Sequence, residues 1–244
     1  LKTFEGSPFT KLLFNDAEMT MVDNDNYSIV TTLTKGRTYT LTGVSDFADW
    51  DVDRDFFERA DVSDPETLTF LPMTGMYKVT ANFKHRYLKI EAMKSATELA
   101  TLNADGSGAI WAIGGTEVGK PTLKNAASWS PEDGGLCLAR VADKKYQLTL
   151  VAGISLNASS FDFKFFHQKT WGGEFGGKDI STASDLVKIS DSGNLGLVEG
   201  KTLSQYIEEK GRLDYKEAIS ITRQVASALS LAHKNQIVHR DIKP

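Results

Sequence analysis

Residues 76–91 read MYKVTANFKHRYLKIE, and this stretch decides the fold class of the front of the chain. Two runs rich in aromatic, β-branched and alternating polar residues, 76–83 and 86–91, flank the pair Lys84-His85. Strand-forming runs at this spacing are typical of a β-hairpin. The sequence therefore predicts two antiparallel strands joined by a short turn.

Further strand-like runs follow the same rule on both sides of this hairpin. The sequence predicts them at 38–42, 109–113, 146–151 and 161–166, with Gly, Asn, Asp and Pro between them. Short strands broken by turn residues favour β-sandwiches over a sheet alternating with helices. A glycine-containing connection at 104–108 suggests a domain boundary near Asn103.

The composition changes abruptly near residue 200. All 13 Phe, all four Trp and 19 of the 20 Gly come before Lys201. Residues 1–200 carry a net charge of -7, whereas residues 201–244 carry +3. Aromatic and β-branched residues suit sheets, whereas Ala, Leu, Glu and Lys suit helices. The sequence predicts a mostly β protein with two tandem β-sandwich domains, 1–103 and 104–200, the second lacking its closing strands. A two-helix segment, 201–244, follows.

The helical prediction for this last segment rests on spacing. Residues 203, 206 and 207 are apolar at helical intervals, and Gly211 stands where a helix C-terminus favours glycine. Asp214 can cap a second helix, whose apolar residues recur from Ala218 to Ala232.

The chain as a whole excludes several classes of protein. Of its 244 residues, 41% are hydrophobic and 25% charged, which excludes wholesale disorder. No run approaches the roughly 20 apolar residues of a membrane span. A formal net charge of -4 argues against nucleic-acid binding. The single cysteine, Cys137, excludes an internal disulfide framework and a cysteine-based zinc cage, and its apolar neighbours predict that it is buried. Because the chain opens at Leu1 and stops at Pro244, we expect a fragment at both ends.

Residues 237–244 read IVHRDIKP and resemble the start of the catalytic loop of bacterial serine/threonine protein kinases. With the two predicted helices, the resemblance covers roughly residues 198–244. It implies that Asp241 matches the aspartate that accepts the substrate hydroxyl proton and that Lys243 matches the lysine near the transferred phosphate. By the same resemblance, His239 and Arg240 match residues that position the loop.

The remaining parts of a kinase are missing from the sequence. We find no G-x-G-x-x-G loop, no suitably placed strand lysine, no catalytic-loop Asn and no D-F-G. Phosphoryl transfer requires these parts together. We therefore expect no enzyme activity and no cofactor, with ATP and Mg²⁺ belonging to an intact kinase parent only. Asp241 is then expected to be an ordinary solvated aspartate.

The front of the chain resembles another family. Residues 108–114 (GAIWAIG), 163–168 (FKFFHQ), 171–177 (WGGEFGG) and 193–197 (GNLGL) are similar to the outer-surface lipoproteins of Bacteroidetes related to the SusE and SusF starch-binding proteins. This resemblance covers about residues 20–203. It implies tandem β-sandwiches, a lipid anchor at the cell surface, and non-catalytic binding of a polysaccharide beside an outer-membrane glycan transporter.

Aromatic residues offer the candidate sugar site. Sugar C–H faces stack on aromatic rings, and sugar hydroxyls take hydrogen bonds from polar side chains. Trp129 and Trp171 are the candidate platforms, and Lys169, Glu174 and Asn125 could supply hydrogen bonds. The alternative is that Trp171 packs over a turn and Trp129 covers a sheet edge.

Another tryptophan and a set of four aspartates are interpreted without a sugar site. Trp111 lies in an apolar run and is expected in the core. Asp49, Asp51, Asp53 and Asp55 alternate like calcium ligands, but Arg54 replaces the glycine that a calcium loop needs. A solvated acidic strand or turn is therefore the favoured interpretation of these four residues, and the sequence predicts no metal site.

Residues 198–203 (VEGKTL) fit both resemblances. A segment shared by two unrelated proteins favours a chimera, so the sequence suggests that two gene fragments meet there. Loss of the closing strands would then expose a sheet edge and part of the second core. Two other possibilities stay open: a kinase fragment with a sensor region in front, and a structural or adhesion module without a sugar site.

Overall fold

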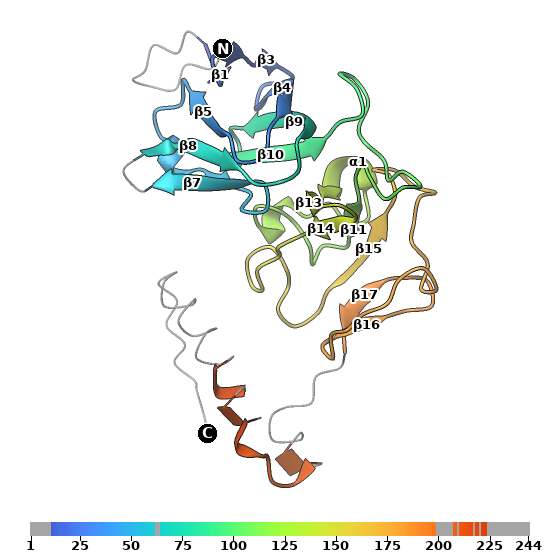
Figure 1. Ribbon diagram of the computed structural model, residues 1–244. Helices are drawn as coiled ribbons and strands as arrows, with labels where there is room; N and C mark the ends of the chain where they lie inside the picture. Colours follow the sequence, from blue (N-terminus) through green and yellow to red (C-terminus); the bar gives the residue numbers. More distant parts are fainter. Residues whose placement is uncertain are drawn as a thin grey trace. The chain divides into compact units, whose positions relative to one another are not determined.

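The computed structural model describes residues 11–61, 64–198, 207–208, 210–216, 218–219 and 221–223. The chain divides into two compact units, Leu1–Val198 and Glu199–Pro244, which are described separately. In the described part of the first unit, the regular secondary structure is almost entirely β-strand, with long loops between the strands (Figure 1). The mostly β fold that the sequence predicts is therefore confirmed.

A first five-stranded antiparallel sheet has the order β2-β1-β5-β8-β7. Its strands are β1 (Leu13–Phe14), β2 (Ala17–Glu18), β5 (Thr38–Thr42), β7 (Phe57–Asp61) and β8 (Asp64–Phe70). The strand predicted at 38–42 is therefore confirmed with the same bounds. It contributes Tyr39 and Leu41 to the core on alternate positions, as a strand with one buried face should.

A second five-stranded sheet contains the predicted hairpin and has the order β3-β4-β9-β10-β6. Its strands are β3 (Thr20–Met21), β4 (Asn26–Leu33), β6 (Asp51–Val52), β9 (Gly75–Asn82) and β10 (Tyr87–Ala92). β9 and β10 pair antiparallel from Asn82 opposite Tyr87, so the hairpin is confirmed with a turn at residues 83–86. Arg86, with φ of 50°, provides the left-handed residue of this turn.

The remaining strands form a third sheet and a separate ribbon. The third sheet has the order β12-β11-β15-β17-β16, and β13 pairs with β14. These strands are β11 (Trp111–Gly114), β12 (Leu136–Cys137), β13 (Ala139–Ala142), β14 (Lys145–Gln147), β15 (Asp162–Phe166), β16 (Val187–Ile189) and β17 (Leu195–Leu197). Within residues 11–61 and 64–198, there are also two 3₁₀ turns and one short helix: η1 (Phe47–Asp49), η2 (Leu123–Asn125) and α1 (Pro131–Gly134).

One predicted strand is largely wrong. The prediction for 146–151 holds only at its start, because β14 ends at Gln147. The backbone N–H of Thr149 instead donates to the carboxylate of Asp55, 2.6 Å away, and so is not available to a strand partner. A tertiary contact has replaced the local β-propensity of this run.

One large hydrophobic core is shared by the three sheets. Side chains of the first two sheets, such as Phe14, Leu68 and Val79, belong to one buried cluster with Trp111 and Phe166 of the third sheet. Trp111 is fully buried, as expected, and its indole N–H donates to the carbonyl of Ala100. The two β regions, residues 11–103 and 104–198, therefore pack against one another and share core side chains.

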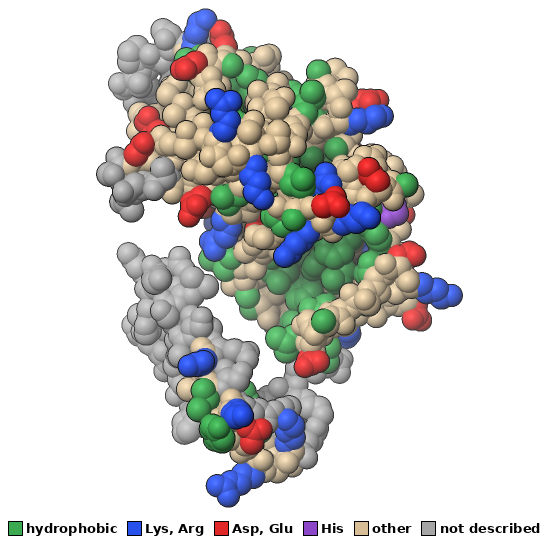
Figure 2. Space-filling model, in the orientation of Figure 1, with side chains coloured by type: hydrophobic (Ala, Val, Ile, Leu, Met, Phe, Trp, Pro, Cys, Tyr) green, Lys and Arg blue, Asp and Glu red, His purple; other side chains and the backbone are tan. Residues whose placement is uncertain are grey.

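The third sheet has a second, thinner core. Only four of its residues are buried in this cluster: Ala112, Val118, Leu138 and Phe163. Nine hydrophobic side chains around them are only partly buried: Ile110, Leu136, Tyr146, Leu148, Leu150, Leu156, Phe161, Phe165 and Leu195. Figure 2 shows hydrophobic side chains gathered over this half of the unit. The side chains around the second core are thus only partly covered. That closing strands are missing stays a prediction.

In the second compact unit, the described residues 207–208, 210, 215–216, 218–219 and 221–223 are helical, and residues 211–214 are not. Gly211 takes the left-handed conformation (φ of 75°) expected just past a helix end. Asp214 caps the next helix by accepting a hydrogen bond from the backbone N–H of Lys216, at 2.8 Å. The kinase-like positions His239, Arg240, Asp241 and Lys243 lie outside the described residues. Within the described part of the chain, no helix could cross a membrane.

Candidate functional site

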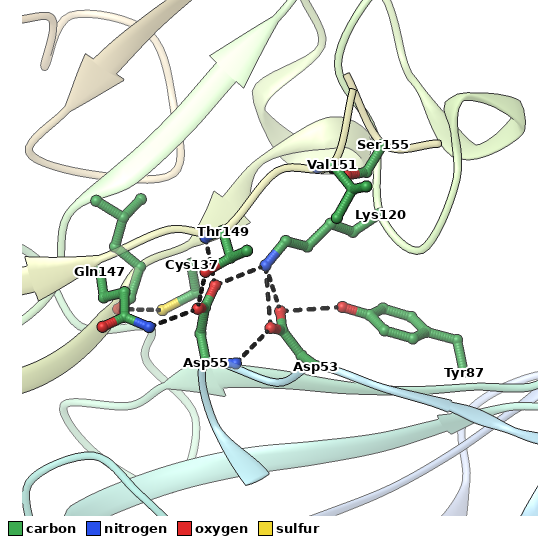
Figure 3. A network of polar contacts seen from close by, with 10 residues as sticks. Asp53, Asp55, Tyr87, Lys120, Cys137, Gln147, Thr149, Val151 and Ser155 are labelled. Atoms are coloured by element: carbon green, nitrogen blue, oxygen red, sulfur yellow. Dashed lines mark hydrogen bonds and ion pairs between the residues drawn. The ribbon is translucent and has the colours of Figure 1, made fainter. Parts of the chain in front are cut away.

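A buried ionic network joins the two β regions (Figure 3). The ammonium group of Lys120 lies 2.8 Å from an oxygen of Asp53 and 3.0 Å from an oxygen of Asp55. The three side chains are at most 8% exposed. Removing one partner of such a buried ion pair strongly destabilises the folded protein, because the other charge is then left buried without a partner.

Asp55 makes most of the contacts in this network. Besides Lys120, its carboxylate accepts hydrogen bonds from the amide of Gln147 and from both the backbone N–H and the hydroxyl of Thr149. Burial alone would raise the pKa of Asp55, but Lys120 and these donors outweigh it and lower the pKa. Asp55 is therefore held as a carboxylate.

Asp53 links the same lysine to the hairpin. The hydroxyl of Tyr87 donates to Asp53 at 3.3 Å, and burial followed by the charge of Asp53 raises the pKa of Tyr87 well above its usual value. The expected solvated acidic turn is thus wrong for Asp53 and Asp55, which are buried partners of Lys120. Asp49 and Asp51 are exposed, as expected. In the described part of the chain, no three acidic, histidine or cysteine side chains gather as metal ligands.

A second buried carboxylate lies on β10. Glu91 is 4% exposed and pairs with Lys89 at 2.9 Å and with Lys169 at 2.8 Å. Burial would raise the pKa of Glu91, but the two lysines outweigh burial and lower it to about 2. The Lys169 ammonium also lies 5.7 Å from the ring centre of Trp111, within the range of a cation–π contact.

These two ionic clusters contribute to the wall of a groove of about 560 Å³. One side of the groove comes from β9 and β10, and the other from residues 124–127, α1 and Lys169. Five lysines line it: Lys78, Lys89, Lys120, Lys124 and Lys169. Five carboxylates line it too: Asp23, Asp53, Glu91, Glu132 and Asp133. The groove is therefore rich in hydrogen-bonding groups, with charges of both signs in equal number.

Two of the five predicted sugar-binding residues line this groove. Asn125 ends η2, where its side-chain oxygen accepts a hydrogen bond from the hydroxyl of Thr122 at 3.3 Å. Lys169 reaches the groove from the segment after β15, but its ammonium is already engaged with Glu91. Lys169 is thus a fixed part of the wall.

Trp129 and Trp171 have different surroundings. Trp129 is half-buried, packs against the main core and donates its backbone N–H to the carbonyl of Gly114. Trp129 therefore lies against the core beside the end of β11. Trp171, by contrast, is 52% exposed.

The turn after β15 fixes the position of Trp171. Its indole makes an edge contact with the buried ring of Phe166, the two ring centres being 5.8 Å apart. The amide of Gln168 donates to the carbonyl of Trp171 at 3.1 Å. The carboxylate of Glu174 accepts the backbone N–H of Gly172, which has a φ of 84°. Glu174, another predicted sugar ligand, therefore shapes the turn that presents Trp171.

Sequence reasoning missed the groove. The alternating aspartates at 49–55 were a signal, but their partner Lys120 lies about 65 positions further along the chain. Nothing local in the sequence links them. The burial of Cys137 is confirmed: it is 6% exposed, and burial raises the pKa of its thiol to about 12.

Two family models match the chain. Residues 1–102 match the domain of unknown function DUF5125, and residues 105–216 match the domain of unknown function DUF5121. The second match extends past residues 198–203, the segment at which the sequence suggested a junction. No solved structure matches the chain significantly.

Several curated relatives match a short part of the chain. A probable serine/threonine-protein kinase of Clostridium perfringens is 50% identical over 66 residues, which is 27% of this chain and 9% of that protein. The serine/threonine-protein kinase PrkC of Bacillus subtilis is 60% identical over 47 residues, 19% of this chain and 7% of that protein. A probable serine/threonine-protein kinase of Clostridium acetobutylicum is 37% identical over 89 residues, 34% of this chain and 13% of that protein. The chain thus spans less than one seventh of the length of each of these relatives.

Proposed function

We propose that residues 1–198 bind a polysaccharide without cleaving it, as a surface module of the SusE and SusF type. The observation that carries this proposal is the exposed indole of Trp171, held against Phe166 on a well-hydrogen-bonded turn. Large exposed aromatic rings on a rigid turn suit sugar binding, because they stack on sugar C–H faces and lose little conformational entropy on binding.

Polar groups beside the ring support the same function. Gln168 and Glu174 belong to the turn itself, and their side chains hydrogen-bond the backbone of Trp171 and Gly172. Such groups orient a sugar ring through its hydroxyls, while the aromatic ring supplies most of the contact area. By the same proposal, the parent protein lies at the cell surface, anchored by lipid, with an outer-membrane glycan transporter as partner.

The proposal assigns no phosphoryl transfer to this chain. The similarity to kinases covers 47 to 89 residues in the relatives described above, whereas two other family models account for residues 1–102 and 105–216. In a kinase, a nucleotide-binding lobe precedes the catalytic loop, whereas in this chain the preceding residues match the two other domain models. ATP and Mg²⁺ would belong to the intact kinase parent.

The proposal also includes a chimeric origin, in which a β-protein gene and a kinase gene fragment meet. Long-read sequencing across codons 190–216 of the source DNA tests this origin. We expect reads in which the two parts occur in separate genes. Uninterrupted natural genes that carry both parts would overturn it, and the DUF5121 match through residue 216 is the observation in favour of that outcome.

Affinity gel electrophoresis of the whole chain tests sugar binding. Gels containing amylose, xylan or mannan should retard the protein in at least one case, and Trp171→Ala should restore at least half of the lost mobility. Tyr215→Ala is the matched control, because Tyr215 is also an exposed aromatic residue, at 70%, but lies in the helical tail. A chain that no polysaccharide retards would be a structural module, and the proposed function would fall.

A further inference from the structure

We propose that the groove between the β9–β10 hairpin and the segment of residues 124–135 is a second carbohydrate site, and that it takes a neutral oligosaccharide. This inference rests on the proposed function, but it concerns a place on the molecule other than the Trp171 turn. Of the described residues that line the groove, none belongs to residues 170–175. The groove volume of about 560 Å³ is within the range of ligand pockets for small organic molecules.

The charge balance of the lining indicates the class of ligand. The five lysines and five carboxylates leave no net charge on the wall. An anionic sugar would face three carboxylates that have no lysine within ion-pair distance in the described structure: Asp23, Glu132 and Asp133. A sugar hydroxyl can instead donate to a carboxylate and accept from an ammonium group at the same time. A mixed lining of this kind therefore suits a neutral, polyhydroxylated ligand.

The inner wall of the groove is already organised. Asp53 and Glu91 are held by buried lysines, so these charged groups keep their positions without a ligand. Preorganised polar groups favour binding, because a ligand does not have to order them. Thr80, on β9, is 9% exposed and lines the groove, and within the described structure its hydroxyl has no hydrogen-bond partner. A buried hydroxyl without a partner is costly, and a ligand hydroxyl can satisfy it.

The rim of the groove supplies groups that are free to bind. Lys124 and Glu132 are exposed and Lys78 is half-buried, and all three line the groove. In the described part of the chain, no carboxylate pairs with Lys78 or Lys124 within 4 Å, whereas the three deeper lysines are all paired. Lys78 and Lys124 can therefore donate to sugar hydroxyls without first breaking an ion pair.

Isothermal titration calorimetry of the whole chain tests this inference by stoichiometry. The probes are maltohexaose, xylohexaose and mannohexaose, with hexagalacturonate as the anionic counterpart. We expect the wild-type chain to bind two molecules of at least one neutral hexasaccharide and Trp171→Ala to bind one. Adding Lys78→Ala and Lys124→Ala to Trp171→Ala should weaken the remaining binding at least tenfold. Lys188→Ala, which removes an exposed lysine of β16, is the matched control and should leave both sites intact.

The outcomes separate the two proposals. If Trp171→Ala abolishes all binding, the groove is not a site, whereas the proposed function stands. If the groove variants keep full affinity, or if hexagalacturonate alone binds the groove, the inference is overturned. If no glycan binds the wild-type chain, both proposals fall. Ala126→Trp, which fills the groove with an aromatic ring, is a second variant that should abolish groove binding without removing a charge.

Discussion

Asp55 shows how one side chain can hold two β regions together. Its carboxylate accepts hydrogen bonds from Lys120, Gln147 and Thr149, all of which lie at least 65 positions later in the chain. Such a buried carboxylate is stable only while its donors stay in place. The strand expected at 146–151 ends early for the same reason, because Thr149 bonds Asp55 instead of a neighbouring strand.

Replacing Asp55 by Ala should lower the free energy of unfolding by about 3 kcal/mol, because it leaves Thr149 and Gln147 without their acceptor and Lys120 with Asp53 alone. Urea unfolding followed by tryptophan fluorescence measures the change. Asp49→Ala is the control, since Asp49 is exposed, and should change stability by less than about 0.5 kcal/mol. Equal effects of the two substitutions would contradict a buried junction.

The lowered pKa of Glu91 makes the stability of the folded protein depend on pH. Its pKa of about 2 in the folded protein lies below the usual value of 4.5. The stabilisation by Glu91 is therefore fully present above pH 4.5 and is lost as the pH falls through 2. It amounts to about 3 kcal/mol at neutral pH. Urea unfolding between pH 5 and pH 2 should show a loss of this size, beyond the loss that exposed carboxylates cause.

The variant Glu91→Gln should be less stable at pH 7 and should lose less stability than the wild-type protein between pH 4.5 and pH 2. Glu98→Gln is the matched control, because Glu98 also pairs with a lysine, Lys94, but is 62% exposed. The Glu98 variant should follow the wild-type pH profile. If Glu91→Gln follows that profile too, the ion pairs of Glu91 do not act as described.

At the scale of elements, local patterns predicted the hairpin and several of the strands, but not the strand order of the sheets. The β9–β10 pair and β5 could be found because alternation and turn residues are local signals. The groove could not be predicted, because its walls come from strands and loops that are distant in the sequence and meet only through tertiary packing. Trp171 was found by its residue type, whereas the structure was needed to separate it from half-buried Trp129.

The turn that joins the two β regions depends on Gly108. Its φ is 88°, and a Cβ atom there would lie 1.9 Å from the carbonyl oxygen of Thr101. Gly108→Ala should therefore cost about 3 kcal/mol of stability, from the left-handed backbone and the displaced chain together. Gly36→Ala is the control, because Gly36 has a similar φ of 77° and open space around its Cα. It should cost about 1 kcal/mol.

Thermal unfolding of both variants measures the difference. If Gly36→Ala and Gly108→Ala lower the melting temperature equally, backbone conformation alone matters, and the close approach of Thr101 to Gly108 does not.

At the scale of the whole molecule, the abrupt change of composition near residue 200 corresponds to two compact units, Leu1–Val198 and Glu199–Pro244. The first unit has a large core that its β regions share, and buried ion pairs between these regions. We therefore expect residues 11–198 to unfold as one cooperative unit. The proposed function is assigned to this unit, and we propose no part in it for the kinase-like tail.

Differential scanning calorimetry of the whole chain tests this division most directly. A ligand that binds the folded protein but not the unfolded chain stabilises the folded state and raises its melting temperature, by more as the ligand concentration exceeds the dissociation constant. We predict one main transition. Its melting temperature should rise with the neutral hexasaccharide that corresponds to a polysaccharide retarding the chain, and should stay unchanged with Mg²⁺-ATP. A shift caused by Mg²⁺-ATP, with no response to any glycan, would contradict the account.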